Sequence, residues 1–543
     1  MTEGLTEDQR AVRADCEVIV IGAGFAGLYA AQKLTGLGFS VLGFERGDDV
    51  GGVWHWNRYP GARCDCESYF YSYSFSDELQ KEWSWSLRYS EQPEIQRYLS
   101  HVADRFDLRR HFRFSTTVES AAFDEATSLW TVRSDKGDVV TARFVLAASG
   151  CLSTMQTPDI PGFETFEGEV FYTAAWPPEG VDFTGKRVGV IGTGASGIQV
   201  ITRVAPQAEH LTVFQRTANW VLPVWNAPMD PEFDAWSKSH HQEFRQRCLT
   251  SHGALPYDPP RRKASEVSDE ERQKIFEDYW ARGGIQFLSA LSDLFSNIKS
   301  NDAAADFVRG KIREIVKDPV LAKRLTPNDH PIGTKRPPME DGYYQTFNRE
   351  NVELVDIRSA PITGFDGRML LTKDGSYTLD ALVMATGFDA ITGALMAIDI
   401  KGKDGVSLRD EWAKGARSYL GIGVAGFPNL FTVTGPLSPS VLANMPTAVE
   451  QHVDWIADCL VHMREHGLTR IEPRREAQDE WVNHVADVAS GTFYERANSW
   501  YLGANIPGKP RQFAIYLGGF ANYKRRCDAV AEAEYDGFEL SLA

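Results

Sequence analysis

The chain has 543 residues, 43% of them hydrophobic and 14 of them tryptophan, and its formal net charge is −17. This length and composition exclude a disordered protein and predict about two to four domains. The negative charge argues against nucleic acid as a partner, because a polyanion would be repelled.

The seven cysteines are scattered, odd in number and without a Cys-x-x-Cys pair, so we expect reduced thiols rather than a disulfide framework. Cys64 and Cys66 have no nearby histidine, and no metal site is predicted. The segment from Met1 to Asp15 is acidic and polar and lacks the regions of a secretory signal. No apolar run approaches the length of a membrane span. These observations predict a cytoplasmic monomer or weak oligomer with no membrane partner.

The first structured unit begins with a continuous apolar run, residues 17–21, which is typical of a buried parallel strand. A G-x-G-x-x-G pattern and a helical pattern follow. Such glycines let the backbone and the helix N-terminus approach a pyrophosphate. A second strand, residues 40–44, ends in a glutamate 18 residues after the last glycine, where a carboxylate can accept from ribose hydroxyls, as in FAD. The candidate cofactor-binding residues of this unit are Gly22, Gly24, Phe25, Ala26, Gly27, Glu45 and Arg46.

A second unit repeats this order with a different charge. An apolar run over residues 187–191 leads into another G-x-G-x-x-G pattern, and the second strand covers residues 211–214. An arginine lies 19 residues after the last glycine. A guanidinium binds a 2′-phosphate that a carboxylate would repel, so this unit is predicted to bind NADPH. Its candidate cofactor-binding residues are Gly192, Thr193, Gly194, Ala195, Ser196, Gly197, Arg216 and Thr217.

The remaining pattern predicts an α/β fold made of two Rossmann-like dinucleotide-binding domains, for FAD and NADPH, with a mainly helical insert. Ser268 and Glu271 form the pattern of a capping box at the start of one insert helix. A third apolar strand, residues 382–386, ends at Gly387. The expected boundaries are 1–150 and 388–543 for the FAD domain, 151–222 and 331–387 for the NADPH domain, and 223–330 for the insert.

Two dinucleotide sites in one chain imply hydride transfer from NADPH to a flavin. Reduced flavin commonly passes electrons to a disulfide or reacts with O2. The sequence contains no redox cysteine pair at suitable spacing, which favours O2 chemistry.

Longer motifs carry a family resemblance. Residues 51–65 match G-G-x-W-x-x-x-x-Y-P-G-x-x-x-D at every fixed position, and residues 385–389 and 499–509 are also similar. From about residue 18 to residue 540, the chain resembles the type I Baeyer-Villiger monooxygenases. The resemblance implies FAD and NADPH as cofactors, and conversion of a small apolar ketone and O2 into an ester or lactone through a C4a-peroxyflavin. The first motif adds Gly52, Val53, Trp54, Tyr59 and Asp65 to the candidate cofactor-binding residues.

The resemblance also implies individual roles. Arg336 is the expected catalytic arginine, because a permanent guanidinium charge stabilises a peroxide anion, and Asp65 is expected to orient it. Lys335 is expected to bind NADPH phosphate together with Arg216. Trp500 resembles a residue on a mobile loop that closes over the nicotinamide side, although an isolated Trp more often packs in a core.

Residues 435–445 resemble a substrate-side loop of this family, and Leu442 and Met445 are candidate pocket residues for an apolar ketone. Ordinary loop packing is the alternative interpretation of both side chains.

One diagnostic motif departs from the family pattern F-x-G-x-x-x-H-x-x-x-W, which is expected on the linker between the nucleotide domains. The chain has Phe166, Gly168 and Trp176 at the fixed positions but Tyr172 in place of histidine. Tyrosine keeps a ring and a hydrogen-bonding tip but carries no positive charge near neutral pH. We therefore expect altered coupling of NADPH oxidation to oxygenation, with weaker activity or leakage of hydrogen peroxide.

Three other functions compete with ketone oxygenation. They are oxygenation of nitrogen or sulfur centres, uncoupled NADPH oxidation, and nucleotide binding without catalysis. The motif over residues 51–65 and Arg336 favour ketone oxygenation, whereas Tyr172 keeps uncoupled oxidation open.

Overall fold

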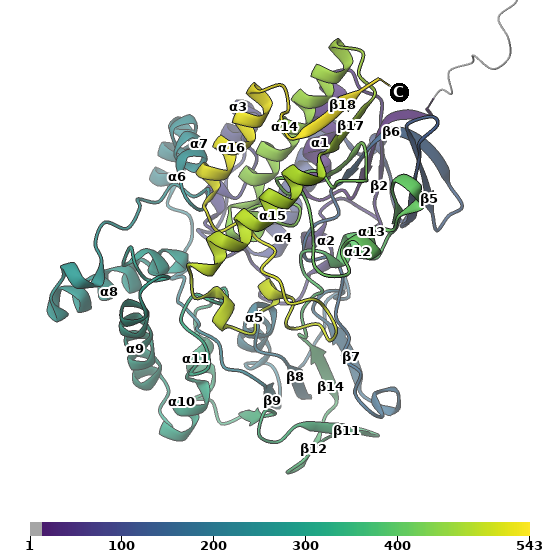
Figure 1. Cartoon of the computed structure of the whole chain (residues 1–543). Coiled ribbons are helices and arrows are strands. Elements are labelled where there is room, and N and C mark those ends of the chain that lie inside the picture. Colours follow the sequence, from purple (N-terminus) through teal and green to yellow (C-terminus); the bar gives the residue numbers. More distant parts are fainter. Residues whose placement is uncertain (1–13, 543) are drawn as a thin grey trace, which may run out of the picture.

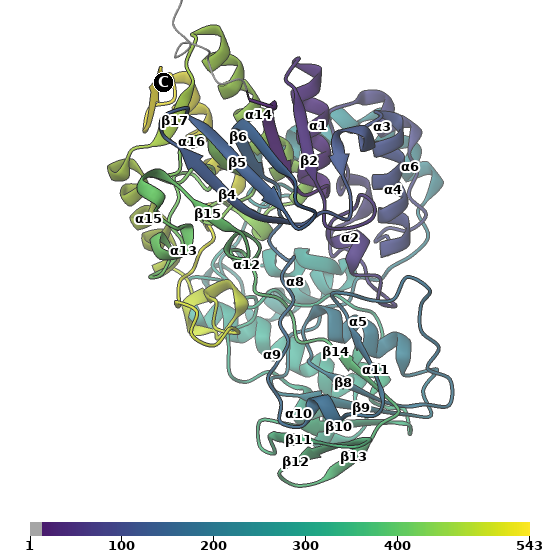
Figure 2. The ribbon, with the colours of Figure 1, turned by 90° about the vertical axis from the view of Figure 1, so that its right-hand side faces the viewer.

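A computed structural model describes residues 14–542, so most of the acidic N-terminal segment lies outside the described residues. Two separate sheets, each flanked by helices, lie toward opposite ends of the molecule (Figure 1, Figure 2). None of the described helices combines the length and the apolar character of a transmembrane span. The arrangement confirms the predicted α/β class with two dinucleotide-binding folds.

The larger sheet has eight strands in the order β15-β4-β5-β6-β1-β2-β3, with β16 also paired to β6. The pairs that β1 forms with β2 and β6 are parallel, and the pairs that β5 forms with β4 and β6 are antiparallel. Strands from both halves of the chain form this sheet. Its strands are β1 (Cys16–Ile21), β2 (Val41–Phe44), β3 (Phe112–Arg113), β4 (Val118–Asp124), β5 (Leu129–Ser134), β6 (Val139–Ala147), β15 (Asp399–Lys401) and β16 (Leu430–Thr432).

The second sheet has five strands in the order β10-β9-β8-β14-β7, and all four pairings are parallel. Because parallel strands share one direction, their carboxyl ends form one edge at which a ligand can bind. The strands are β7 (Glu169–Tyr172), β8 (Arg187–Ile191), β9 (His210–Gln215), β10 (Val352–Asp356) and β14 (Ala381–Met384).

Two smaller sheets and several helices complete the two ends of the molecule. The small sheets are both antiparallel. They consist of β11 (Ile362–Asp366), β12 (Met369–Thr372) and β13 (Ser376–Thr378), and of β17 (Arg470–Pro473) and β18 (Phe538–Ser541). The helices outside the insert are α1 (Phe25–Gly36), α2 (Val53–Trp56), α3 (Asp77–Glu82), α4 (Gln92–Arg105), α5 (Ala195–Val204), α11 (Tyr343–Thr346), α12 (Gly393–Met396), α13 (Leu408–Glu411), α14 (Met445–Glu465), α15 (Arg475–Ser490) and α16 (Phe520–Glu532).

The segment between β9 and β10 is mainly helical, as predicted. It contains α6 (Pro231–Ser239), α7 (His241–Thr250), α8 (Asp269–Arg282), α9 (Ile298–Ile315) and α10 (Pro319–Leu325), which extend to one side of the molecule (Figure 1). The expected capping box is present: the hydroxyl of Ser268 accepts from the Glu271 N–H at 3.2 Å, and the Glu271 carboxylate accepts from the Ser268 N–H at 2.9 Å. This exchange satisfies two N–H groups at the helix start.

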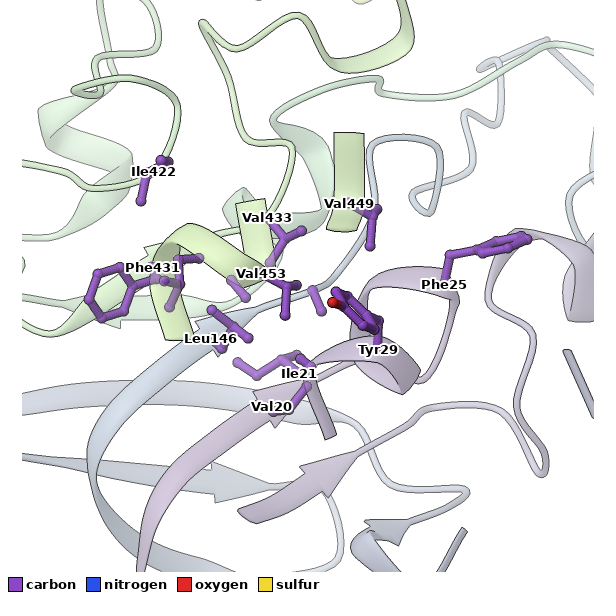
Figure 3. Close-up of a cluster of buried hydrophobic side chains, with 14 of the residues drawn as sticks. Val20, Ile21, Phe25, Tyr29, Leu146, Ile422, Phe431, Val433, Val449 and Val453 are labelled. Atoms are coloured by element: carbon purple, nitrogen blue, oxygen red, sulfur yellow. The ribbon is translucent and has the colours of Figure 1, made fainter. Parts of the chain in front are cut away.

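The core of the first unit forms where β1, β6, α1 and α14 meet (Figure 3). Val20 and Ile21 of β1 pack with Leu146 of β6, and Val453 of α14 covers them. The hydroxyl of Tyr29 on α1 donates to Asp454 of α14 at 2.7 Å. A helix from the C-terminal half of the chain thus buries one face of the first nucleotide unit and fixes its orientation.

Candidate active site

A cavity of about 1820 Å³ is lined by residues of both α/β units. The glycine loop before α1 lies on one side of its lining, and the glycine loop before α5 lies on another. The segments around Asp65, Arg336 and Trp500 also contribute. Residues that are far apart in the sequence therefore share one space.

Both helices that open into this cavity begin without a side-chain cap. Helix α1 starts after Gly24 and α5 starts after Gly194, and neither has a capping side chain or an acidic residue in its first turn. Their first N–H groups are free for an anion, and the helix dipole adds positive potential there. A side chain added at Gly194 would meet no atom within 4 Å. The loops therefore fit the pyrophosphate groups of two dinucleotides.

The third glycine of each loop is required for close packing of helix against strand. A Cβ on Gly27 would lie 1.7 Å from the carbonyl oxygen of Gly22, and one on Gly197 would lie 2.1 Å from that of Gly192. Both distances are far shorter than van der Waals contact. The two units have the same local construction, as the repeated pattern predicted.

Different side chains come after the second strands of the two units. Glu45, after β2, is buried and accepts hydrogen bonds from the N–H groups of Ala23 at 2.7 Å and Gly47 at 2.6 Å. In this structure the Glu45 carboxylate stabilises the first glycine loop through these hydrogen bonds. Its expected contact with ribose stays a prediction. Arg216, after β9, is exposed and lines the cavity.

Asp65 and Arg336 meet in the cavity although 271 residues separate them in sequence. Nη2 of Arg336 donates to Oδ1 of Asp65 at 2.8 Å, and Nε donates to Oδ2. Nη1 donates to the carbonyl oxygen of Val441 at 2.9 Å. Every nitrogen of the guanidinium is therefore held, which fixes both the plane of the group and its position.

Both side chains of the Asp65–Arg336 pair are held in their charged forms. Burial opposes ionisation of Asp65, but the charge and hydrogen bonds of Arg336 hold the pKa of Asp65 below its usual value. Burial likewise opposes the charge on Arg336, but Asp65 raises the pKa of that guanidinium well above its usual value. Tyr501 lies beside the pair, and burial raises its pKa to about 12 despite the neighbouring cation. The cavity is therefore lined by a permanent cation with a fixed orientation, and a buried neutral phenol, that of Tyr501, lies beside this cation.

Comparisons with known proteins agree with this geometry. Residues 15–230 match the family of flavin-binding monooxygenase-like proteins. A Baeyer-Villiger monooxygenase from Pseudooceanicola batsensis is 43% identical over 98% of this chain and 97% of its own length. The chain belongs to the type I Baeyer-Villiger monooxygenases.

A solved structure and a further relative are also similar to the chain over nearly its whole length. The oxidized steroid monooxygenase bound to NADP is 50% identical, with a TM-score of 0.94, over 97% of this chain and 100% of that chain. A phenazine N-monooxygenase from Lysobacter antibioticus is 40% identical over 96% of this chain and 97% of its own length. Relatives of nearly equal similarity are therefore named for different reactions.

Most of the site residues predicted from the sequence line this cavity of the Baeyer-Villiger family member. Those that do so are Gly24, Phe25, Ala26, Val53, Trp54, Tyr59, Asp65, Gly192, Thr193, Gly194, Ala195, Ser196, Arg216, Thr217, Lys335, Arg336, Met445 and Trp500. The remaining ones lie outside its lining: Gly22, Gly27, Glu45, Arg46, Gly52, Gly197, Leu442 and the four residues of the linker motif. Of these, Gly22, Gly27, Glu45 and Gly197 shape the loops that do line it.

The linker motif forms β7 and the turn after it, at the edge of the second sheet. The ring of Phe166 packs on Phe365 at 5.3 Å, and Tyr172 pairs with Met384 of β14. Trp176 is buried, and its backbone N–H donates to the carbonyl oxygen of Trp56 in the first unit at 3.4 Å. The motif thus connects the two units, and Tyr172 lies in the connecting strand rather than in the cavity.

Two of the family motifs contact each other beside the cavity. Lys509, at the end of the segment 499–509, forms an ion pair with Asp389 and donates to the carbonyl oxygen of Ala390 at 2.8 Å. The side-chain amide of Asn505 donates to the carbonyl oxygen of Phe388 at 2.9 Å. The segment that carries the half-buried Trp500 is therefore anchored just after β14, over the cavity.

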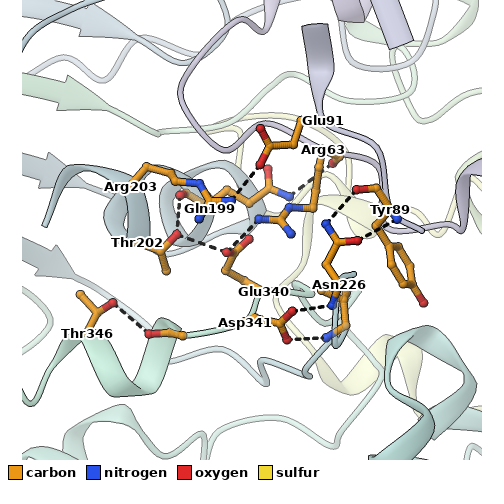
Figure 4. A network of polar contacts seen from close by, with 12 residues as sticks. Arg63, Tyr89, Glu91, Gln199, Thr202, Arg203, Asn226, Glu340, Asp341 and Thr346 are labelled. Carbon is orange, nitrogen blue, oxygen red and sulfur yellow. Dashed lines mark hydrogen bonds and ion pairs between the residues drawn. The ribbon is translucent and has the colours of Figure 1, made fainter. Parts of the chain in front are cut away.

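A polar network joins the segment 59–63 to helix α5 of the second unit (Figure 4). The hydroxyl of Tyr59 donates to Gln199 at 2.8 Å, and the Gln199 amide donates to the carbonyl oxygen of Arg63 at 3.3 Å. Arg63 forms an ion pair with Glu340 at 3.0 Å, and both side chains are almost fully buried. Burial raises the pKa of Glu340 to about 7, although the charge of Arg63 opposes this.

This network joins the same two segments as the Asp65–Arg336 pair. Arg63 and Asp65 lie on one segment, and Arg336 and Glu340 lie on the other. In one ion pair the first segment provides the cation, Arg63, and in the other it provides the anion, Asp65. Arg63 and Glu340 were not predicted from the sequence. Only their spacing, two and four residues from the expected catalytic pair, could have indicated them.

Proposed function

We propose that this chain is an FAD- and NADPH-dependent Baeyer-Villiger monooxygenase that converts an apolar ketone and O2 into an ester or lactone. The observation that carries the proposal is the Asp65–Arg336 pair in the cavity into which the two uncapped helices open. A fixed cation at that position matches a reaction in which negative charge develops on oxygen.

Bound FAD supplies the redox chemistry, since it accepts hydride from NADPH and activates O2. The residues of the chain supply electrostatics and position. Arg336 offers a permanent positive charge to the oxygen atoms that become negative, and Asp65 keeps the guanidinium in one plane. Because the carbonyl oxygen of Val441 also accepts a hydrogen bond from Arg336, the proposed substrate-side loop is in direct contact with the proposed catalytic cation.

The side chains of the second unit support the proposal that it binds NADPH rather than NADH. Arg216, Thr217 and Lys335 line the cavity near the glycine loop before α5. Burial lowers the pKa of Lys335, and the nearby charge of Arg216 lowers it further, while Asp329 opposes both effects. A 2′-phosphate would relieve the repulsion between these two cations, which gives it a physical reason to bind here. Trp500 lines the cavity, and its proposed role is to cover the nicotinamide end and keep out water.

The substrate is proposed to be an aryl-aliphatic, cyclic or steroid ketone. Met445 lines the cavity together with Val441 and Ala443, which gives this side an apolar surface. Leu442 does not line it, so its contact with substrate would require the loop to move. The similarity to a steroid monooxygenase supports including a bulky ketone among the substrates to be tested.

The cellular compartment, the oligomeric state and the domain boundaries are further parts of the proposal. All seven cysteines are unpaired in the described residues, which supports a reducing compartment such as the cytoplasm. A monomer or weak oligomer, and the domain division at 1–150, 151–222, 223–330, 331–387 and 388–543, remain part of the proposal.

The test is aerobic turnover of the purified yellow protein with phenylacetone, a mid-sized cyclic ketone and a steroid ketone. NADPH loss, ester or lactone, and hydrogen peroxide are followed in parallel. Ester matching the NADPH consumed is the expected result. An N- or S-oxide from amine or sulfide substrates, with no ester from any ketone, would contradict it; the similarity to a phenazine N-monooxygenase makes this the second candidate function.

Peroxide formed in place of ester would assign an uncoupled NADPH oxidase instead. Tyr172→His then becomes the deciding variant, because it restores the family residue on the connecting strand β7. Bound FAD with no NADPH oxidation in air would leave only a nucleotide-binding protein.

A further inference from the structure

A second arginine lies at the same sheet edge as Arg216. Strands β9 and β10 are parallel neighbours, with Gln215 opposite Asp356 at their carboxyl ends. Arg216 comes one residue after the end of β9, and Arg358 comes two residues after the end of β10. Both arginines line the cavity. The second one belongs to no nucleotide fingerprint, because 142 residues, including the whole helical insert, separate it from Arg216 in the sequence.

Direct contacts bring Arg358 into the predicted phosphate site. Its Nη2 donates to the hydroxyl of Thr217 at 2.8 Å and to Oδ2 of Asp329 at 2.6 Å. Asp329 lines the cavity as well. Its other oxygen contacts Nδ1 of His330 at 2.7 Å, and burial lowers the pKa of that histidine, which favours its neutral form.

The balance of charge at this edge suits a phosphate monoester. Arg216, Lys335 and Arg358 carry three positive charges, and Asp329 carries one negative charge. The hydrogen bonds from Arg358 and His330 keep Asp329 ionised, with its pKa lowered to about 2 although burial acts in the opposite direction. The net charge of about +2 matches a phosphate monoester, which carries roughly −1.5 to −2 near neutral pH.

We propose that Arg358 is a third ligand of the 2′-phosphate of NADPH and that Asp329 is the counter-ion that holds Arg358 in place beforehand. The inference rests on the proposed NADPH site of the second unit. Because Asp329 repels the phosphate while it orients the arginine, the two residues act in opposite directions on affinity. Together they set how strongly the enzyme prefers NADPH to NADH.

The experiment measures binding to the FAD-containing protein by calorimetry, without turnover. The probes are 2′,5′-ADP, which carries the 2′-phosphate, and 5′-AMP, which lacks it. Arg358→Ala is expected to weaken 2′,5′-ADP binding about 10-fold or more, as the loss of a charge-assisted hydrogen bond does, and to leave 5′-AMP binding unchanged. Arg358→Lys should retain part of the affinity. Asp329→Asn should strengthen 2′,5′-ADP binding by a few-fold.

Arg368 provides a matched control. Its side chain is 52% exposed, against 53% for Arg358, and it also pairs with an aspartate, Asp380 at 3.0 Å, but it does not line the cavity. Arg368→Ala should leave the affinity for both probes unchanged. Equal affinities of wild type and Arg358→Ala for 2′,5′-ADP would overturn the inference and leave an ordinary surface ion pair. If wild type itself does not prefer 2′,5′-ADP to 5′-AMP, the proposed NADPH site fails instead.

Discussion

The two nucleotide units share one backbone construction but differ in the side chains that come after the second strand. In the first unit, Glu45 is buried and its two oxygens are engaged by backbone N–H groups of the glycine loop and the strand end. In the second unit, Arg216 is exposed at the cavity, and Arg358 lies on the neighbouring strand end. From this difference we expect that the glycines determine where a pyrophosphate can lie and that the side chains at the strand ends determine which nucleotide binds.

The largest effect is expected where the two units meet at the Asp65–Arg336 pair, the proposed catalytic pair. Arg336→Met should lower ester formation by about 100- to 1000-fold, because the site loses a preorganised charge at the reacting oxygen. FAD should remain bound, since neither glycine loop is altered. Product analysis together with the flavin absorbance checks both statements. Arg336→Lys keeps the charge but loses the two-pronged contact with Asp65, so near wild-type activity in that variant would argue against the geometric role of the pair.

A second pair of variants tests whether the two loops serve different nucleotides. Gly27→Ala would place a Cβ 1.7 Å from the Gly22 oxygen, and Gly197→Ala would place one 2.1 Å from the Gly192 oxygen. Each clash should cost about 1–3 kcal/mol or more. The first variant should lose FAD, and the second should stay yellow but bind NADPH poorly. Cofactor content and NADPH titration separate these outcomes.

Gly36→Ala is the matched control for those variants. It lies on α1, and an added Cβ there would meet no atom within 4 Å. It should retain both nucleotides. Loss of FAD from Gly197→Ala with NADPH binding intact would reverse the assignment of the two units.

A smaller effect is expected when the second unit receives an acidic residue after its second strand, as the first unit has. Arg216→Glu should raise the KM for NADPH about 10- to 100-fold, because a charge-assisted contact is replaced by repulsion of the 2′-phosphate. The KM for NADH should change much less. Steady-state rates with both nucleotides provide the measurement, and an equal rise for both would contradict a 2′-phosphate site at Arg216.

The smallest effect concerns the buried ion pair at the interface of the units. The pKa of Glu340 in the folded protein, about 7, lies above its usual value of 4.5. Between these pH values the folded state holds a proton that the unfolded state has released. The stability due to this group is therefore complete below about pH 4.5 and is lost as pH rises through about 7. Between pH 6 and 8 the loss amounts to about 1.4 kcal/mol.

Glu340→Gln should remove that part of the pH dependence. Chemical unfolding at pH 6 and pH 8 measures it, as the difference in free energy of unfolding for wild type and variant. Glu119→Gln, at an exposed position on β4, is the control and should keep the wild-type dependence. An unchanged slope in Glu340→Gln would show that Arg63 keeps the carboxylate ionised throughout this range.

Features that depend on neighbouring residues could be predicted from the sequence, and features that depend on distant ones could not. The capping box of α8, the strands that end in glycine and the two glycine loops all arise from residues a few positions apart. The pairing of Asp65 with Arg336 was expected only because the chain resembles a known family. The contact of Tyr59 with Gln199 and the burial of Glu340 against Arg63 were not expected at all.

The sequence by itself determined that the chain has two dinucleotide loops with opposite charges after their second strands. Glycine spacing, apolar periodicity and caps act through local backbone geometry, so they can be read without knowing the fold. Only the tertiary structure decided which distant side chains enter the shared cavity: Arg336 beside Asp65, and Arg358 beside Thr217. Such contacts depend on how the helical insert returns the chain to the second sheet and on how the two units pack. No short stretch of sequence specifies either.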